Sequence, residues 1–364
     1  MVSWFIRRKI PPVQSTLEQL TDLARDRSGG GRHTLFDRVA GLLLESNGKL
    51  PSGATLLIDQ ILTGLLHEVE ADVRKKLACR IATLEGAPRE LIRALAADEI
   101  EIAEPILANS PVLSTQDLLD IIAARSPAHR EVIARRAHVP AEVVSALVRL
   151  KDPKVIQTLL SNAGAAIPRN IFNDLVAIAE GMEQIRMPIT GREDMPKDLA
   201  YQMFWYVSAA MRRSILDRFP IEARELDGIM AELVAERGAS RLRPFPQQPA
   251  WTSGEVQALV AKARSGDIEG FTRALAVVTG VDGATARRIV SDLGGEPLAV
   301  ACKAMGADRI QYTTIVLQVD KMVSGMSRPP AFLADAARVF DSVTTSRAKA
   351  MLKVWSLHSS PQAA

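Results

Sequence analysis

Cysteine is scarce in this chain of 364 residues. Its two cysteines, Cys79 and Cys302, lie more than two hundred residues apart. Such a pair supplies neither a disulfide framework nor the clustered ligands of a metal site, so we expect no metal and no other cofactor. Because so little cysteine suits a reducing compartment, we expect a cytoplasmic location.

Aromatic residues are also few, at 4% of the chain, although apolar residues make up 47%. The apolar set consists mainly of Ala, Leu, Ile and Val, interleaved with Arg, Glu and Asp. Because this mixture favours helices over sheets, we predict an all-α fold. No apolar stretch without charges is long enough to cross a bilayer, so we expect no integral membrane segment.

The chain lacks a strong excess of either charge, since 45 basic and 42 acidic side chains leave a net charge of +3. This balance neither requires nor excludes a nucleic-acid partner. Pairs of adjacent arginines keep nucleic-acid binding as an alternative, because a helical repeat can line a surface with cations that hold a phosphate backbone. Acidic residues on the same helices make this alternative less favoured. The pairs are Arg135-Arg136, Arg212-Arg213 and Arg287-Arg288.

The usual motifs of catalysis are missing. The sequence has no Gly-x-Ser-x-Gly elbow, no Walker motif and no dinucleotide-binding fingerprint. The glycine run at residues 29–31 is not followed by Gly-Lys-Ser/Thr, so we interpret it as a helix connection. No two of the five histidines have the spacing of metal ligands on one helix. We therefore expect no catalytic, metal-binding or cofactor-binding residues, and a protein that is not an enzyme.

What the sequence does contain is internal repetition between residues 70 and 180. In four successive units, an apolar helix is followed by a break and then by a second helix. Each first helix carries an apolar anchor that we expect to be buried between neighbouring repeats. The anchors, at spacings of 29, 27 and 26 residues, are Leu77, Ile106, Ile133 and Leu159.

The second helices begin near residues that suit a helix start, namely Pro88, Ser114, Pro140 and Pro168. Each carries two apolar residues four positions apart, which make one stripe on the helix. A single stripe is too narrow to form a core within one unit, so the units have to stack. This predicts an α-solenoid of short two-helix repeats. Its spacing is shorter than that of a HEAT repeat and close to that of the leucine-rich-repeat variant.

Together these patterns predict five segments. They are an N-terminal helical cap (1–69), the helical repeats (70–180), long helices that close the solenoid (181–238), a proline-rich linker (239–251) and a C-terminal helical domain (252–358). In the cap we expect helices at 15–26, 32–45 and 52–69, and in the closing segment at 197–219 and 221–237. The C-terminal helices are expected to start near Thr252, Ile268, Gly283, Glu296, Asp308, Pro330 and Thr345.

Several phrases of the sequence resemble the alphaproteobacterial family DUF2336. Three lie before or among the repeats, at residues 67–74, 98–103 and 110–114. Two follow the repeats, with the sequences MFWYVSAAMRR at 203–213 and GGEPLAVACK at 294–303. The family name denotes a domain of unknown function. The resemblance, expected over nearly the whole chain, therefore implies an all-α repeat fold and transfers no catalytic residue.

The predicted fold favours a non-catalytic, regulatory scaffold for protein–protein interactions, whose partner the sequence does not identify. A solenoid presents a rigid face built from the same helix of successive repeats. We expect these charged residues near the ends of the first helices to be exposed and to contact the partner: Arg74, Arg130, Arg136 and Lys154.

A third alternative is a small-ligand-binding helical protein. Its site would be the aromatic patch formed by Tyr201, Phe204 and Trp205. Aromatic residues at helical spacing belong to a core more often than to a ligand site, so we favour the core interpretation.

Overall fold

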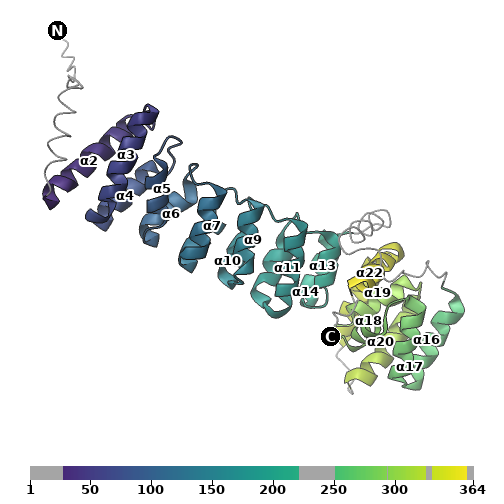
Figure 1. Ribbon diagram of the computed structural model, residues 1–364. Helices are drawn as coiled ribbons and strands as arrows, with labels where there is room; N and C mark the ends of the chain where they lie inside the picture. The colour runs from purple at the N-terminus through teal and green to yellow at the C-terminus, as the bar shows by residue number, and fades with distance from the viewer. Residues whose placement is uncertain (1–27, 221–250, 293, 325–329, 359–364) are drawn as a thin grey trace, which may run out of the picture. The chain divides into compact units, whose positions relative to one another are not determined.

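The computed structural model describes residues 28–220, 251–292, 294–324 and 330–358. This part of the chain is 75% helical and contains no strand, which confirms the all-α prediction. Val139 and Ala165 form an isolated parallel bridge. None of the described helices combines the length and the apolar character that a membrane crossing requires. The chain divides into two compact units, unit 1 with residues 1–171 and unit 2 with residues 172–364 (Figure 1).

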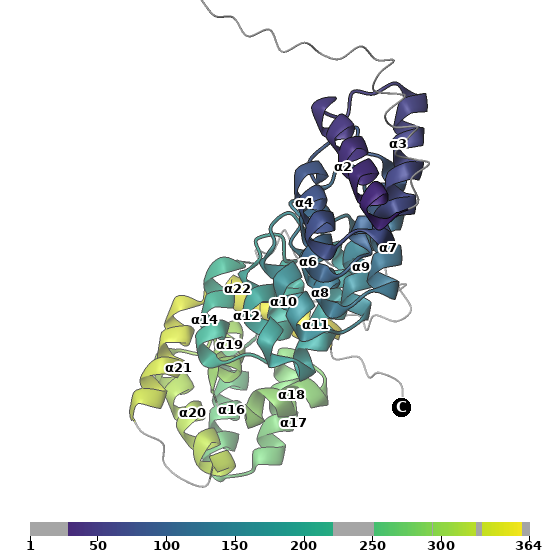
Figure 2. The same cartoon turned by 90° about the vertical axis from the view of Figure 1, so that its left-hand side faces the viewer.

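Unit 1 consists of short helices stacked in pairs (Figures 1 and 2). The first helices of the pairs are α2 (Gly29–Glu45), α4 (Ala71–Ile81), α6 (Ile100–Asn109), α8 (Pro127–Ala134) and α10 (Pro153–Ser161). The second helices are α3 (Ser52–Leu65), α5 (Arg89–Ala96), α7 (Thr115–Ala124) and α9 (Ala141–Arg149), and α3 continues into the short 3₁₀ helix η1 (Leu66–Glu68). Helix α4 packs on α6, α6 on α8, and α8 on α10, so these four helices form one continuous row, the first-helix row.

The second helices start where the sequence predicts. Pro88 and Pro140 are the N-cap residues of α5 and α9, and Pro168 directly precedes α11 (Arg169–Gly181). Ser114 caps α7 through a capping box, in which its hydroxyl accepts from the Asp117 N–H while the Asp117 carboxylate accepts from the Ser114 N–H.

The predicted repeat anchors are buried. Leu77 is 4% exposed, and Ile106, Ile133 and Leu159 are fully buried. The apolar pairs of the second helices are buried as well: Leu91/Leu95, Leu118/Ile122, Val143/Leu147 and Ile171/Leu175. Burying one such side chain contributes about 1.5–3 kcal/mol. The regular placement of these apolar residues therefore stabilises the stack of first and second helices.

Unit 2 is a helical bundle around α19 (Glu296–Ala304). Every residue from Glu296 to Cys302 is buried, and the helix packs on α18, α20, α21 and α22. A helix that is buried on all sides needs an apolar surface all round, which the alanine-rich sequence of α19 provides. The described helices of unit 2 also include α12 (Arg186–Gly191), α13 (Lys197–Met203), α14 (Ala209–Arg218), α16 (Ser253–Ser265), α17 (Ile268–Thr279), α18 (Gly283–Ser291), α20 (Arg309–Ser324), α21 (Pro330–Ser342) and α22 (Thr345–His358).

All seven predicted starts after residue 251 lie within one residue of an observed helix start. The prediction of one long helix at 197–219 is wrong. Helix α13 ends at Met203, and α14 begins at Ala209 after Ser208, whose hydroxyl accepts a hydrogen bond from the Met211 N–H. A serine in this N-cap position starts a new helix rather than continuing the previous one.

Helices α12 to α14 belong to the same compact unit as the C-terminal helices. Their residues fall in the predicted segment 181–238, which we expected to close the solenoid. The predicted helices at 15–26 and 221–237 and nearly all of the predicted linker lie outside the described residues.

The burial of Ile133 leads to a stability prediction. Replacing Ile133 by Asp places an unpaired charge between α6 and α10, so we expect unit 1 to lose several kcal/mol of stability. Three of the four tryptophans, Trp205, Trp251 and Trp355, lie in unit 2. Far-UV circular dichroism should therefore show an earlier transition for I133D, while tryptophan fluorescence changes little.

The control is Ala128→Asp on the same helix, because Ala128 is exposed. Equal melting curves for I133D and A128D would show that Ile133 does not occupy the core of the row.

Candidate functional site

Arg74 is held inside unit 1 rather than presented to a partner. Its guanidinium forms a bidentate pair with Asp98, with an Nε–Oδ2 distance of 2.7 Å, and donates to the Val69 carbonyl over 2.9 Å. The Arg74 side chain is only 15% exposed. The expected exposure of Arg74 is therefore wrong.

Arg130 and Arg136 are also half-buried and bound to backbone carbonyls. Arg130 donates to the Ile122 carbonyl over 2.9 Å, and Arg136 donates to the carbonyls of Leu107 and Ser110, the latter over 2.9 Å. Burial lowers the pKa of the Arg136 guanidinium from its ordinary value. The last carbonyls of a helix have no partner within that helix, so a long donor side chain from the next repeat satisfies them. The expected exposure of both arginines is wrong for this reason.

Asn162 repeats the role of Arg136 one repeat later. Its side-chain amide donates to the carbonyls of Ala134 and Arg136 over 2.9 and 2.7 Å. Asn162 is absent from the residues predicted from sequence, although the sequence contains a signal for it. Ser110, Arg136 and Asn162 are each 26 residues apart, so each donor reaches the carbonyl of its own equivalent in the preceding repeat.

Two buried carboxylates make the matching contacts at the second helices. Asp59 on α3 accepts hydrogen bonds from the N–H groups of Glu90 and Leu91, at 3.0 and 2.8 Å, and thereby caps α5. Asp117 on α7 is 4% exposed and pairs with Arg89 and Arg93 on α5. These contacts tie α5 to its neighbours α3 and α7 through charge-assisted hydrogen bonds.

Lys154 is the one predicted contact residue that is exposed, with 76% of its side chain accessible. Its ammonium lies 2.8 Å from Glu131 on α8, which also pairs with Arg135. The hydrogen bond from Lys154, helped by the charge of Arg135, lowers the pKa of Glu131 below its ordinary value. Lys154 and Arg135 border a groove of about 530 Å³ on α8 and α10, the α8–α10 groove. It is lined by Arg135, Lys154, Gln157, Thr158, Ser161 and Asn162.

The aromatic patch is mainly core. Tyr201 and Phe204 are fully buried, and Trp205 is half-buried. The Tyr201 hydroxyl donates to the Phe219 carbonyl over 2.7 Å, and the Trp355 indole N–H donates to the Tyr201 carbonyl over 3.1 Å. The rings of Trp205 and Trp355 lie 4.7 Å apart, so these residues join α13 to α22 instead of lining a ligand site.

A buried ion-pair network lies beside the aromatic patch. Arg212 forms a bidentate pair with Asp292, at 2.7 and 2.6 Å, and donates to Glu296 and to the Phe204 carbonyl, each over 2.9 Å. The side chains of Arg212 and Glu296 are 8% and 3% exposed. Burial alone would lower the pKa of Arg212, but the hydrogen bonds and charges of Asp292 and Glu296 outweigh this effect and raise it.

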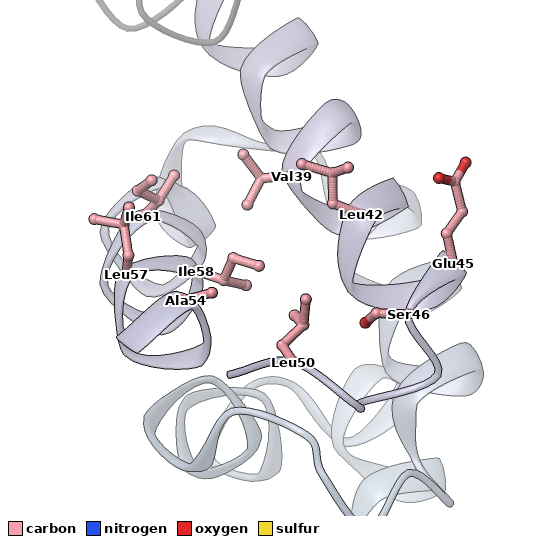
Figure 3. A pocket seen from close by; sticks show the side chains of 9 residues that line it. All are labelled: Val39, Leu42, Glu45, Ser46, Leu50, Ala54, Leu57, Ile58 and Ile61. Atoms are coloured by element: carbon pink, nitrogen blue, oxygen red, sulfur yellow. The ribbon is translucent and has the colours of Figure 1, made fainter. Parts of the chain in front are cut away.

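Helices α2 and α3 enclose an apolar groove of about 470 Å³ (Figure 3). Its walls carry aliphatic side chains such as Leu42 and Ile58, and Glu45 and Ser46 lie at its edge (Figure 3). Leu57 remains 57% exposed there. The groove therefore offers mainly apolar contact, and Glu45 and Ser46 are its only polar lining residues within the described part of the chain.

The described residues assemble no group of three or more His, Cys, Asp or Glu side chains that could hold a metal ion. Burial raises the pKa of the Cys302 thiol to about 12, so this thiol stays protonated at neutral pH and is a poor nucleophile.

Stacked short helices in unit 1 and a bundle around a buried helix in unit 2 define the class of the protein as all-α. A family model described as an uncharacterised protein conserved in bacteria, DUF2336, matches residues 102–353. The chain belongs to this family. The match begins at residue 102, so the expected coverage of nearly the whole chain is too broad, and the phrase at 67–74 lies outside it. No curated protein and no solved structure matches the chain.

The two phrases that follow the repeats meet in the structure. Arg212 belongs to the phrase at 203–213 and Glu296 to the phrase at 294–303, and the ion pair between them joins the two segments. Both phrases lie within the matched residues. The two phrases of the resemblance therefore contain the residues that hold α14 against α19.

The Asp117 contacts predict a pH dependence. Burial alone would raise the pKa of Asp117, but hydrogen bonds from Ser114 and the charge of Arg89 outweigh it and lower the pKa. The stability supplied by ionised Asp117 is therefore complete above about pH 4 and is lost as the pH falls through the lower pKa of the folded state. Urea unfolding of Asp117→Asn and wild type should differ most at neutral pH, with a difference that shrinks below about pH 4.

Asp120→Asn is the matched control, since Asp120 is an exposed carboxylate on the same helix. A D117N effect that is constant across this pH range would contradict the assignment.

The Arg212 network predicts a large loss of stability on mutation. Arg212→Met leaves two buried carboxylates without their cation, so we expect unit 2 to lose about 3–5 kcal/mol. Tryptophan fluorescence during urea unfolding measures this loss. The triple variant R212M/D292N/E296Q, which removes all three charges, should recover at least about 1 kcal/mol of it.

Arg309→Met serves as the control, because Arg309 pairs with Asp341 at the surface, where the two side chains are 68% and 47% exposed. Its effect should stay below about 1 kcal/mol. If R212M is no more destabilising than R309M, the network does not hold unit 2 together.

Proposed function

We propose that the protein is a non-catalytic scaffold for protein–protein interactions, built as a HEAT-like solenoid, and that its partner binds the outward surface of the first-helix row. The observation that carries this proposal is the α8–α10 groove, where exposed side chains of two successive first helices lie side by side. A partner that follows this row contacts equivalent positions of neighbouring repeats.

The chemistry of the groove suits a polar segment of a protein partner. Gln157 carries an amide, and Thr158 and Ser161 carry hydroxyl groups, so the groove offers both donors and acceptors to a peptide backbone. Arg135 and Lys154 at its border share Glu131, and the local charge is therefore mixed rather than strongly basic. This favours a protein partner over a phosphate backbone, which needs a segregated basic surface.

The contacts between repeats support the same proposal. Arg74, Arg136 and Asn162 hold successive repeats in register through hydrogen bonds. A surface that is already rigid before binding loses little conformational entropy when the partner arrives. The cytoplasm remains our proposed location, because Cys79 and Cys302 are both free thiols.

Site-specific photocrosslinking in the native host tests the proposal. A photoreactive residue at Gln157 should yield discrete protein adducts, because Gln157 lines the α8–α10 groove. The same residue at Gln116, which is exposed on α7 away from the first-helix row, should not yield them. Adding R135E and K154E to the Gln157 variant should remove most of the adduct.

Equal adducts at Gln116 and Gln157, or adducts that persist in R135E/K154E, would contradict binding at the α8–α10 groove. Adducts that disappear on nuclease treatment would support the nucleic-acid alternative instead. A bound small molecule that copurifies with the chain would support a ligand-binding protein.

A further inference from the structure

Unit 2 carries a surface cavity that is separate from the α8–α10 groove and from the apolar groove of α2 and α3. It has a volume of about 870 Å³ and is lined by residues of α17 and α18 and by Val323 of α20. Helices α17 and α18 pack side by side (Figure 2). Its lining includes the aliphatic residues Ile268, Ala276, Val290 and Val323. We call this feature the α17–α18 groove.

Apolar surface is unusually accessible along this groove. Val277 is 81% exposed and Val323 is 37% exposed, although both are large aliphatic residues. A single exposed valine has no special meaning, but two of them beside one concave apolar surface mark a place that another chain can cover.

The charges at the groove do not balance one another. Arg273 on α17 and Arg287 on α18 are exposed and line the groove, and within the described residues neither has a carboxylate within ion-pair distance. Glu269 precedes Arg273 by one helical turn, yet the two side chains form no ion pair. By contrast, the adjacent Arg288 stacks on Trp205 and Tyr206, 5.1 Å from each ring centre. Arg273 and Arg287 are thus available to an incoming acidic group.

The two arginines occupy matching places on the two helices. Glu269, Arg273 and Val277 follow one another at intervals of four on α17, as do Gly283, Arg287 and Ser291 on α18. Positions four apart lie on one face of a helix. Each of the two helices therefore presents one arginine to the groove, and α17 also presents Glu269 one turn before Arg273.

We propose that the α17–α18 groove binds an amphipathic helix of a partner protein, whose apolar stripe is flanked by acidic residues. The apolar stripe covers Val277 and Val323, while carboxylates on either side of the stripe pair with Arg273 and Arg287. A helix is the fitting occupant because a groove between two helices accepts the side-chain ridges of a third. The proposal does not depend on binding at the first-helix row, since it concerns different residues of a different unit.

A charge-swap titration on the full chain tests this inference. The probe is a fluorescein-labelled helical peptide of about 18 residues, with leucines at helical spacing and glutamates on both sides of the stripe. A second peptide carries lysine at every glutamate position. Fluorescence polarisation should show saturable binding of the acidic peptide, at least about tenfold weaker binding of the basic one, and weakening of the acidic complex by salt.

The variant R273E/R287E should reverse this preference, losing affinity for the acidic peptide by about tenfold or more and gaining affinity for the basic one. The variant K262E/R264E is the matched control. It changes the net charge equally, at exposed residues of α16 outside the groove, and should leave both affinities unchanged. Circular dichroism should show the same helical content for both variants, because all four side chains are exposed.

The inference is overturned if the acidic peptide shows no saturable binding, or if R273E/R287E binds it as tightly as the wild type does. Sedimentation with anionic phosphatidylglycerol vesicles provides a separate outcome. The chain could cosediment with these vesicles through Arg273 and Arg287 and fail to bind the acidic peptide. That result would assign the groove to a lipid surface and overturn the inference.

Discussion

The unpaired ends of very short helices are the constraint on which unit 1 depends. Helices α5 and α8 contain only eight residues, and every helix leaves four N–H groups at its start and four carbonyls at its end without an intrahelical partner. In an eight-residue helix these unpaired groups outnumber the internal hydrogen bonds. Such a helix is stable only where neighbouring elements bury its apolar stripe and bind its ends.

Side chains bind the unpaired groups at both ends of these helices. Caps such as Ser114 and Asp152 satisfy N–H groups from within the same repeat, and Asp59 does so from the preceding one. Arg136 and Asn162 reach back to the carbonyls at the end of the preceding first helix. Charged and polar side chains near the helix ends therefore act as structural links between repeats, and this role reduces the number of them that remain for a partner.

Much of the fold was predictable, because it rests on local patterns. Pro88 and Pro140 mark helix starts, and Ile133 and Leu159 repeat at a regular spacing, so neither signal requires knowledge of distant residues. The exposure of Arg74 and Arg136 was not predictable in the same way. An arginine can extend into solvent or fold back onto a carbonyl, and the choice depends on the position of the neighbouring repeat.

Two features of unit 2 could not be predicted from the sequence, each for a different reason. The break between α13 and α14 contains neither glycine nor proline, and Ser208 alone indicates it. The partner of Arg212, Asp292, lies 80 residues further along the chain, so no local pattern could connect the two. The family resemblance pointed to the two segments at 203–213 and 294–303, but it did not show that they are in contact.

The 26-residue spacing of Ser110, Arg136 and Asn162 has a consequence for how such a chain changes in evolution. Each donor binds the residue 26 positions before it, so the bond is defined by a fixed offset rather than by an absolute place in the sequence. A duplication or loss of one 26-residue stretch in this region preserves every such offset. The array can therefore grow or shrink by whole repeats while each junction keeps the same hydrogen bond, whereas an insertion within a helix shifts the donor away from its carbonyl.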